Sequence, residues 1–527
     1  MAALMQSLKI MAQESAFPRL IDGARLCARR MLRPADCPRE CYCMIVSRLK
    51  RRVGRVVHIL VILLHCASHA FAQSAPSSSD RAWHGSGAKQ IEIEARRLGE
   101  SRVTLDPEKI YSLAELIDFA ETHNPETHLG WERARAQAAG LGIARGELYP
   151  TLAAAALSQT RRYEILVGDR FVRQTVQDFD LALSLNYTVF DFGARSARIS
   201  AARADVLAAN FAFNDTHRKV IYRVEEAYYR LLNSTGQEDA AQANLSNARK
   251  VQQAAEERLA NGLATLPDVL EARSATAQSE YDLQAVQGSE EIARGDLATA
   301  LGTSPAAVIH IQPLDRLPTP DSVGDSVDEA IGRALRQRPD LLEQVSQIRS
   351  ANARIKEAHA EYYPDLKLTA IPAARSSYGL QQQVPWAHTS GLLGGIALNL
   401  QWTIFDGGLR KNRLARARAD ARAAEAEADV ERDRITDQVW AAYSNLNTAL
   451  RQRQAATALL EAASQSYDAA LESYKYGLRN LLDVTAAQQT LAQARAADVF
   501  ARTQVLSALA SLAFQTGDLI QQNAARP

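Results

Sequence analysis

Residues 181–193 read LALSLNYTVFDFG, and residues 396–408 read IALNLQWTIFDGG. In each stretch apolar and small side chains alternate over about ten residues, the length that a tilted strand needs to cross a bilayer. A period of two indicates a β-strand. One face is wholly apolar and the other is uncharged, a pattern typical of a membrane barrel with water inside. A half-buried sheet of a soluble protein would give the same alternation, so the pattern alone leaves that alternative open.

The two stretches belong to an internal duplication. Landmarks recur 214 or 215 residues apart: Tyr149-Pro150 with Tyr363-Pro364, Phe190-Asp191 with Phe405-Asp406, Gly262 with Gly477. Each copy has the same order, with a helical segment ending at Tyr-Pro, a pair of strands, a very long helix up to the glycine, and a return helix. The period far exceeds that of solenoid repeats, so the sequence predicts two copies of one unit.

The order of these landmarks sets the predicted boundaries. Repeat 1 covers 104–303, with a strand hairpin over about 151–190, a long helix over about 194–261 and a return helix over about 263–301. A Pro-rich joint follows at 304–327. Repeat 2 covers 328–518, with a hairpin over about 365–405, a long helix over about 409–476, a return helix over about 478–516, and a C-terminal tail at 519–527. We expect polar hairpin tips near 167–169 and 381–390. Pro372 falls in the predicted strand that begins at Asp365, so we expect it at an edge or a bulge.

The first 103 residues differ from the rest. Residues 44–72 combine a basic stretch, an apolar run of about 12 residues and a small-residue site at Ala70–Ala72, which predicts a signal peptide cleaved before Gln73. An uncleaved anchor and a lipoprotein at Cys66 are alternatives. Residues 1–43 are a leader whose status stays open, because translation could start at Met1 or Met44, and 73–103 form an N-terminal tail.

Composition excludes several classes of protein. The chain has 527 residues and is 23% charged, which argues against a disordered chain and a helical membrane bundle. Its 61 Lys+Arg balance 60 Asp+Glu, which argues against nucleic acid as the main partner. All five cysteines precede residue 67, so the mature chain can hold no disulfide framework or cysteine metal site. Beyond the signal peptide no apolar run reaches 18 residues, so any crossing of a membrane must use β-strands.

The long helices favour a tube. Residues 409–476 contain neither Gly nor Pro, and only Gly236 interrupts 194–261. A helix of that length spans roughly 100 Å, which no compact domain requires. A coiled-coil scaffold would explain the helices alone, but the strand hairpins between them favour a tube. Two hairpins give four strands, and an open edge is forbidden in lipid, so two or three copies must close a barrel of eight or twelve strands.

Taken together, these features resemble the TolC family of outer-membrane channels over about residues 104–520. The resemblance rests on the duplication, the Tyr-Pro pairs before the strands, the Phe-Asp-Phe-Gly and Phe-Asp-Gly-Gly exits, and the Gly-x5-Asp-Val turns at 262–269 and 477–484. It implies a mixed α and β membrane protein. The expected assembly is a homotrimer with one 12-stranded β-barrel, four strands per chain, continued by a long α-helical barrel.

The resemblance also implies a function and partners. We expect an exit duct in the cell outer membrane of a Gram-negative bacterium, extending into the periplasm and carrying substrates passively. It would serve a tripartite efflux pump or a type I secretion system. The implied partners are outer-membrane lipid, a periplasmic adaptor (membrane fusion) protein and an inner-membrane pump of ABC or RND type. The passenger (drug, metal ion or secreted protein) and the pump remain open.

Finally, the resemblance implies a periplasmic gate at the turns after the repeated glycines. Tyr474 and Arg479 would tie to the neighbouring turn at Asp268 by charge-assisted bonds. Three copies of Asp483 would form a ring that attracts cations. The chain departs from the family pattern twice, because Ala486 replaces a second aspartate and Pro267 replaces a hydroxyl residue. Ordinary turn and surface chemistry is the alternative for these side chains.

No catalytic constellation emerges. Asp191-Phe192-Gly193 spells a kinase metal motif but lacks the accompanying glycine-rich and catalytic loops. The histidines at 123, 128, 359 and 388 have no metal-ligand spacing. We therefore expect no enzyme activity, no cofactor and no metal site. Two other functions stay open: a periplasmic coiled-coil scaffold or adaptor without a pore, and a diffusion porin, against which the long helices argue.

Overall fold

The computed structural model describes residues 88–100, 105–317, 324, 326–381 and 384–519. The chain divides into two units, Met1–Ser101 and Arg102–Pro527. In the first unit only one helix, α4 (Ala88–Glu100), is described. The predicted leader 1–43 and signal peptide 44–72 lie outside the described residues, as do most of the tail 73–103 and all but Leu519 of the C-terminal tail. Among the described residues, no helix combines the length and apolarity that a membrane crossing requires.

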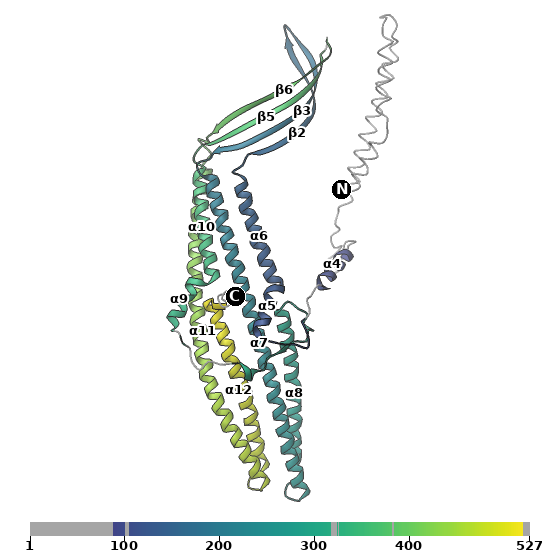
Figure 1. The fold of residues 1–527 in the computed structure, drawn as a ribbon, viewed down its shortest axis with the longest axis vertical. Helices are drawn as coiled ribbons and strands as arrows, with labels where there is room; N and C mark the ends of the chain where they lie inside the picture. Colours follow the sequence, from purple (N-terminus) through teal and green to yellow (C-terminus); the bar gives the residue numbers. More distant parts are fainter. Residues whose placement is uncertain (1–87, 101–104, 318–323, 325, 382–383, 520–527) are drawn as a thin grey trace, which may run out of the picture. The chain divides into compact units, whose positions relative to one another are not determined.

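The second unit contains the duplication. Repeat 1 and the joint comprise β1 (Ile110–Tyr111), α5 (Leu113–His123), α6 (Pro125–Gly146), β2 (Thr151–Val167), β3 (Arg170–Phe190), α7 (Ala194–Ala260), α8 (Leu266–Ala300), β4 (His310–Ile311) and the 3-10 turn Leu314–Arg316. Repeat 2 comprises α9 (Val327–Gln337), α10 (Pro339–Ala360), β5 (Asp365–Gln381), β6 (Val384–Gln401), α11 (Leu409–Lys475) and α12 (Leu481–Thr516). Each repeat therefore places a strand hairpin between a short helical segment and a 67-residue helix (Figure 1).

The four long strands form one antiparallel sheet in the order β2-β3-β5-β6. The two repeats meet at its centre, where β3 pairs with β5, for example Leu181 with Ala374. Among the strands that the structure describes, β2 and β6 each have a neighbour on one side only. Figure 1 shows the sheet as a curved ribbon above the helices of this unit.

Two expectations about the strands were wrong. Most of 381–390, predicted as a hairpin tip, is strand, since the register continues through Ser390 opposite Ser376 and Gln381 pairs with Val384. The polar residues there continue the strand because backbone pairing does not require an apolar face. Pro372, expected at an edge or bulge, lies in the central strand β5. The described pairing to β3 skips from Ala373 to Ala370, because proline has no N–H to donate.

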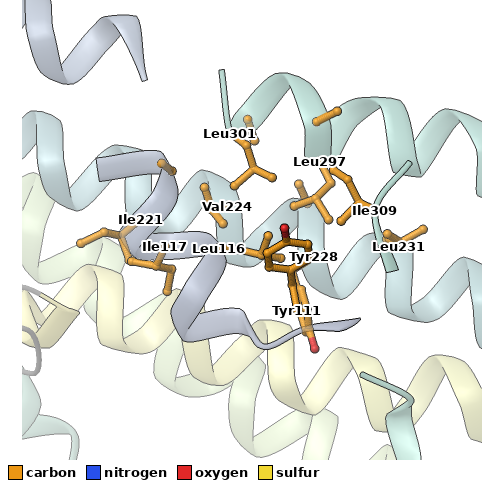
Figure 2. Close-up of a cluster of buried hydrophobic side chains, with 14 of the residues drawn as sticks. Tyr111, Leu116, Ile117, Ile221, Val224, Tyr228, Leu231, Leu297, Leu301 and Ile309 are labelled. Atoms are coloured by element: carbon orange, nitrogen blue, oxygen red, sulfur yellow. The ribbon is translucent and has the colours of Figure 1, made fainter. Parts of the chain in front are cut away.

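The helices pack along one another and bury two clusters of apolar side chains. α7 lies against α6, α8, α10 and α12, and α11 lies against α10 and α12. One core joins α5, α7, α8 and β4 around Leu116, Val224 and Leu297 (Figure 2). The other joins the ends of α7 and α11 to α8 and α12 around Ala255, Ala470 and Val484. This second core holds the two helix-hairpin turns next to each other.

Candidate functional site at the helix-hairpin turns

The α7–α8 and α11–α12 turns have the same backbone geometry. Gly262 and Gly477 both have φ of +74°, a left-handed conformation that glycine adopts without strain. The N–H of Leu263 donates to the Arg258 carbonyl at 2.8 Å, and the N–H of Leu478 donates to the Ser473 carbonyl at 2.8 Å. This closure is a common helix C-terminus and explains why glycine recurs at this point of each repeat.

The two acidic residues of the predicted gate differ in their surroundings. The Asp268 carboxylate accepts hydrogen bonds from the Thr265 N–H at 2.8 Å and the Thr265 hydroxyl at 2.7 Å, and so caps α8. These bonds lower the pKa of Asp268. In the second turn Asn480 caps α12 instead, since its Oδ1 accepts from the Asp483 N–H at 2.8 Å. Among the residues that the structure describes, the Asp483 carboxylate has no hydrogen-bond or ion-pair partner. Both bonds to Asp268 end at Oδ2, so one oxygen of this carboxylate is engaged, whereas neither oxygen of Asp483 is.

Tyr474 and Arg479 lie on the same hairpin but in different environments. The Tyr474 side chain is buried in the core between the turns, and burial raises the pKa of its hydroxyl. That hydroxyl has no hydrogen-bond partner among the described residues. Arg479 is exposed and makes no ion pair with them. Within the described part of the chain no bond joins either residue to Asp268, so the predicted tie to a neighbouring turn stays a prediction.

Arg258, which was not predicted from the sequence, contacts both turns. Its guanidinium donates to the Tyr474 carbonyl, to the Lys475 carbonyl at 3.4 Å and to the Leu263 carbonyl at 3.1 Å. It also lies over the Tyr474 ring, 4.7 Å from the centroid. The available signal was an arginine four residues before Gly262, where the second copy has Ser473 before Gly477. This difference between the two copies does not indicate which groups Arg258 contacts.

A second polar region lies where the sheet meets the helices. A cavity of about 720 Å³ is lined by equivalent positions of both repeats, including Glu147 and Glu361, Tyr149 and Tyr363, Thr188 and Thr403, Arg198 and Arg413. The ion pairs Asp191–Arg195 and Asp406–Arg410, each 2.8 Å, also line it. Polar residues of the strands and of the starts of the long helices therefore line one cavity. Among the residues described, no cluster of three His, Cys, Asp or Glu could hold a metal ion.

Comparison with known proteins identifies the family to which this sequence is similar. Residues 116–303 and 330–518 match the family model described as outer membrane efflux protein. Protein CyaE of Bordetella pertussis is 29% identical over 409 residues, covering 77% of this chain and 84% of that protein. Outer membrane protein OprJ of Pseudomonas aeruginosa is 26% identical over 413 residues, covering 75% and 82%.

Solved structures show the same fold. A membrane protein from Pseudomonas aeruginosa has a TM-score of 0.68 at 23% identity, covering 77% of this chain and 93% of that chain. The outer membrane protein VceC of Vibrio cholerae has a TM-score of 0.63 at 21% identity, covering 77% and 96%. The family match falls on both copies of the duplication, from α5 to α8 and from α9 to α12. The chain belongs to the outer membrane efflux protein family.

Proposed function

We propose that this outer-membrane channel is the passive exit duct of a tripartite assembly, driven by a partner pump in the inner membrane. One observation carries the proposal: a single chain joins a sheet with an exposed apolar face to two 67-residue helices. Ile396, Leu398 and Leu400 alternate along β6 and are 80%, 62% and 69% exposed. Such a face suits lipid. Each long helix spans roughly 100 Å, which suits a passage through the periplasm.

We propose a homotrimer, with four strands from each chain in one 12-stranded β-barrel and the helices continued as an α-helical barrel. β2 and β6 end the sheet with unpaired edges. In hydrocarbon, edges must be paired, which favours closure by further copies of the chain. The cavity between sheet and helices supports a water-filled passage, because charged and hydroxyl side chains line it. The residues that line this cavity form no catalytic arrangement that we recognise, and passive transport requires no catalysis by this chain.

We propose that the turns form the periplasmic gate of this duct. The exposed Arg479 is available to the Asp268 turn of another copy, and three unpartnered Asp483 carboxylates would form a cation-attracting ring. Exposed leucines on both turns suit a protein partner, in keeping with a periplasmic adaptor: Leu263, Leu266, Leu478 and Leu482. The relatives include a pyoverdine export protein and a cation efflux protein, so they do not define one passenger.

The test is ion conductance of the detergent-purified protein in a planar bilayer under a salt gradient. We expect small, discrete, cation-preferring steps. Asp483→Asn should reduce the cation preference, because it removes all three carboxylates of the proposed ring. Arg479→Ser should raise the conductance by loosening the closed mouth.

Folded protein that never inserts would overturn the duct and favour the periplasmic scaffold. Equal ion selectivity in wild type and Asp483→Asn would contradict the proposed ring of Asp483 carboxylates. Unchanged conductance in Arg479→Ser would contradict the proposed bond between Arg479 and the Asp268 turn. Deleting the gene and comparing drug sensitivity with loss of a secreted protein would separate efflux from type I secretion.

A further inference from the structure

We propose that Arg258 is the latch that holds the two helix-hairpin turns of one protomer together in the closed duct. The proposal rests on the proposed function, because a latch matters only where these turns close a passage. Arg258 acts here as a positioning residue. It touches no passenger but fixes the end of α11 against the end of α7.

The contacts of Arg258 join segments that are far apart in sequence. Its own helix, α7, ends at Ala260, and its guanidinium reaches the carbonyls of Tyr474 and Lys475, the last two residues of α11. The same group donates to the Leu263 carbonyl in its own turn at 3.1 Å. One planar cation therefore serves both turns at once. The Tyr474 ring beneath it is 3% exposed, which keeps the guanidinium on a largely buried surface.

The chemistry suits a link that is strong when made and lost when the turns separate. The last carbonyls of a helix have no partner within the helix, and the negative end of the helix dipole attracts a cation. Arginine can donate to several acceptors in a fixed planar arrangement, which lysine cannot. If α11 moved away from α7, the Tyr474 and Lys475 carbonyls would lose the cation and Tyr474 would lose its cover. Separation of the turns therefore breaks several contacts together.

The duplication shows that this arginine is not needed to form a turn. The second turn closes with the same backbone bonds and the same glycine conformation, yet Ser473 stands where the first turn has Arg258. Each protomer thus carries one such arginine among the equivalent positions of its two turns. Its contacts with the Tyr474 and Lys475 carbonyls lie across the hairpins, and the second turn closes without a counterpart of its bond to Leu263.

The test compares Arg258→Gln with Arg273→Gln. Arg273 is on the same hairpin and pairs with Glu256 at 2.9 Å, so it joins α8 to α7 and does not reach α11. Arg258→Gln should raise unitary conductance at least twofold, and Arg273→Gln should not. Arg258→Lys should fall between wild type and Arg258→Gln, because it keeps the charge but loses the planar donor set. Equal conductance of wild type and Arg258→Gln would overturn the latch, as would an equal rise in Arg273→Gln.

A second measurement separates failure of the latch from failure of the duct. Hydrogen–deuterium exchange of the purified protein should be faster at residues 470–480 in Arg258→Gln than in wild type, with no change there in Arg273→Gln. Faster exchange supports the latch even if no variant conducts, and that result would count against the proposed duct alone. Unchanged exchange would overturn the latch. If Arg258→Gln fails to fold, exchange at residues 470–480 is compared between Arg258→Lys and wild type instead. Faster exchange in Arg258→Lys supports the latch, and unchanged exchange overturns it.

Discussion

Arg218 on α7 is 1% exposed and joins the two repeats through a buried ionic cluster. It donates to Asp215 at 2.6 Å and to Asp340 of α10 at 3.0 Å. Arg338 also pairs with Asp340, at 2.5 Å. The two arginines reach the Phe514 and Gln515 carbonyls near the end of α12, at 2.9 and 3.3 Å. Such a cluster satisfies its own buried charges, so removing one member leaves the others uncompensated.

Asp340→Asn should therefore destabilise the protein by about 3 kcal/mol at neutral pH. Burial alone would raise the pKa of Asp340, but the hydrogen bond from Arg338 and the charges of Arg218 and Arg338 lower it from 3.8 to about 2. Since the folded pKa is the lower one, the stabilisation is present above about pH 4 and is lost as the pH falls toward about 2.

Thermal unfolding at several pH values measures this effect. The gap in Tm between wild type and Asp340→Asn should be widest above pH 5 and should shrink as the pH approaches 2. Asp420→Asn is the control, because Asp420 is 66% exposed and its pair with Arg416 is 3.7 Å long. A gap that stays constant with pH would show that Asp340 is not ionised in the folded protein.

The sequence could predict part of the candidate site and not the rest, for a physical reason. The Gly-x5-Asp spacing located both turns, because a left-handed glycine must end each long helix. It could not separate Asp268 from Asp483, because Thr265 and Asn480 are both good N-caps three residues earlier. The structure distinguishes the two aspartates, because the Asp268 carboxylate bonds to Thr265 whereas Asn480 itself caps α12. The spacing could not find Arg258 either, since its acceptors are backbone carbonyls up to 217 residues away and carry no side-chain signal.

Among the helices, Gly236 marks a close approach of α7 to α12. A Cβ at this position would lie 2.7 Å from Val499 Cγ1. Gln237 donates to the Ala496 carbonyl at 2.8 Å, and the Thr503 hydroxyl donates to Asn233 Oδ1 at 3.1 Å, so both helices are held at this level. Glycine costs helix stability, yet here it is the residue that lets the two backbones pack.

Gly236→Ala should lower the unfolding temperature, because overpacking costs about 1–3 kcal/mol while the gain in helix propensity is at most about 1 kcal/mol. Adding Val499→Ala should restore much of the loss by removing the clash. Gly288→Ala is the matched control in α8, where a Cβ meets nothing within 4 Å, and it should raise stability by about 0.5–1 kcal/mol. A destabilised Gly288→Ala, or a stabilised Gly236→Ala, would contradict this packing argument.

For the strands, alternation predicted part of the sheet and underestimated its extent at one end, whereas at the other end it extended the last strand to Phe405, beyond the end of β6 at Gln401. Ten-residue alternation was visible before Phe190 and Phe405, yet β3 has 21 residues and β6 has 18. The additional residues mix polar and apolar side chains without a clean alternation, and backbone pairing holds them in register. The pairing of β3 with β5 across the duplication was also not predictable from either hairpin alone, since each hairpin specifies only its own register.

The two edges of the sheet support the proposed closure by further copies of the chain. β2 leaves the helices and β6 returns to them, so β6 of one chain would meet β2 of the next antiparallel. The two edges differ, and contacts between different surfaces propagate around a ring until it closes. Two chains would close eight strands, whose interior is just wide enough for side chains. Three would close twelve and leave a passage.

Native mass spectrometry of the detergent-solubilised protein should therefore give three chains. Thiol cross-linking offers an independent check, because no cysteine follows Cys66. With Thr151→Cys on β2 and cysteines scanned along residues 395–401 of β6, oxidation at the matching register should give covalent dimers and trimers. Nothing larger should form, because a closed ring of three has no free edge left. Either cysteine alone should give none of these products. A covalent series that stops at two chains would mean an eight-stranded barrel too narrow for a duct, and one that continues past three would mean an open assembly.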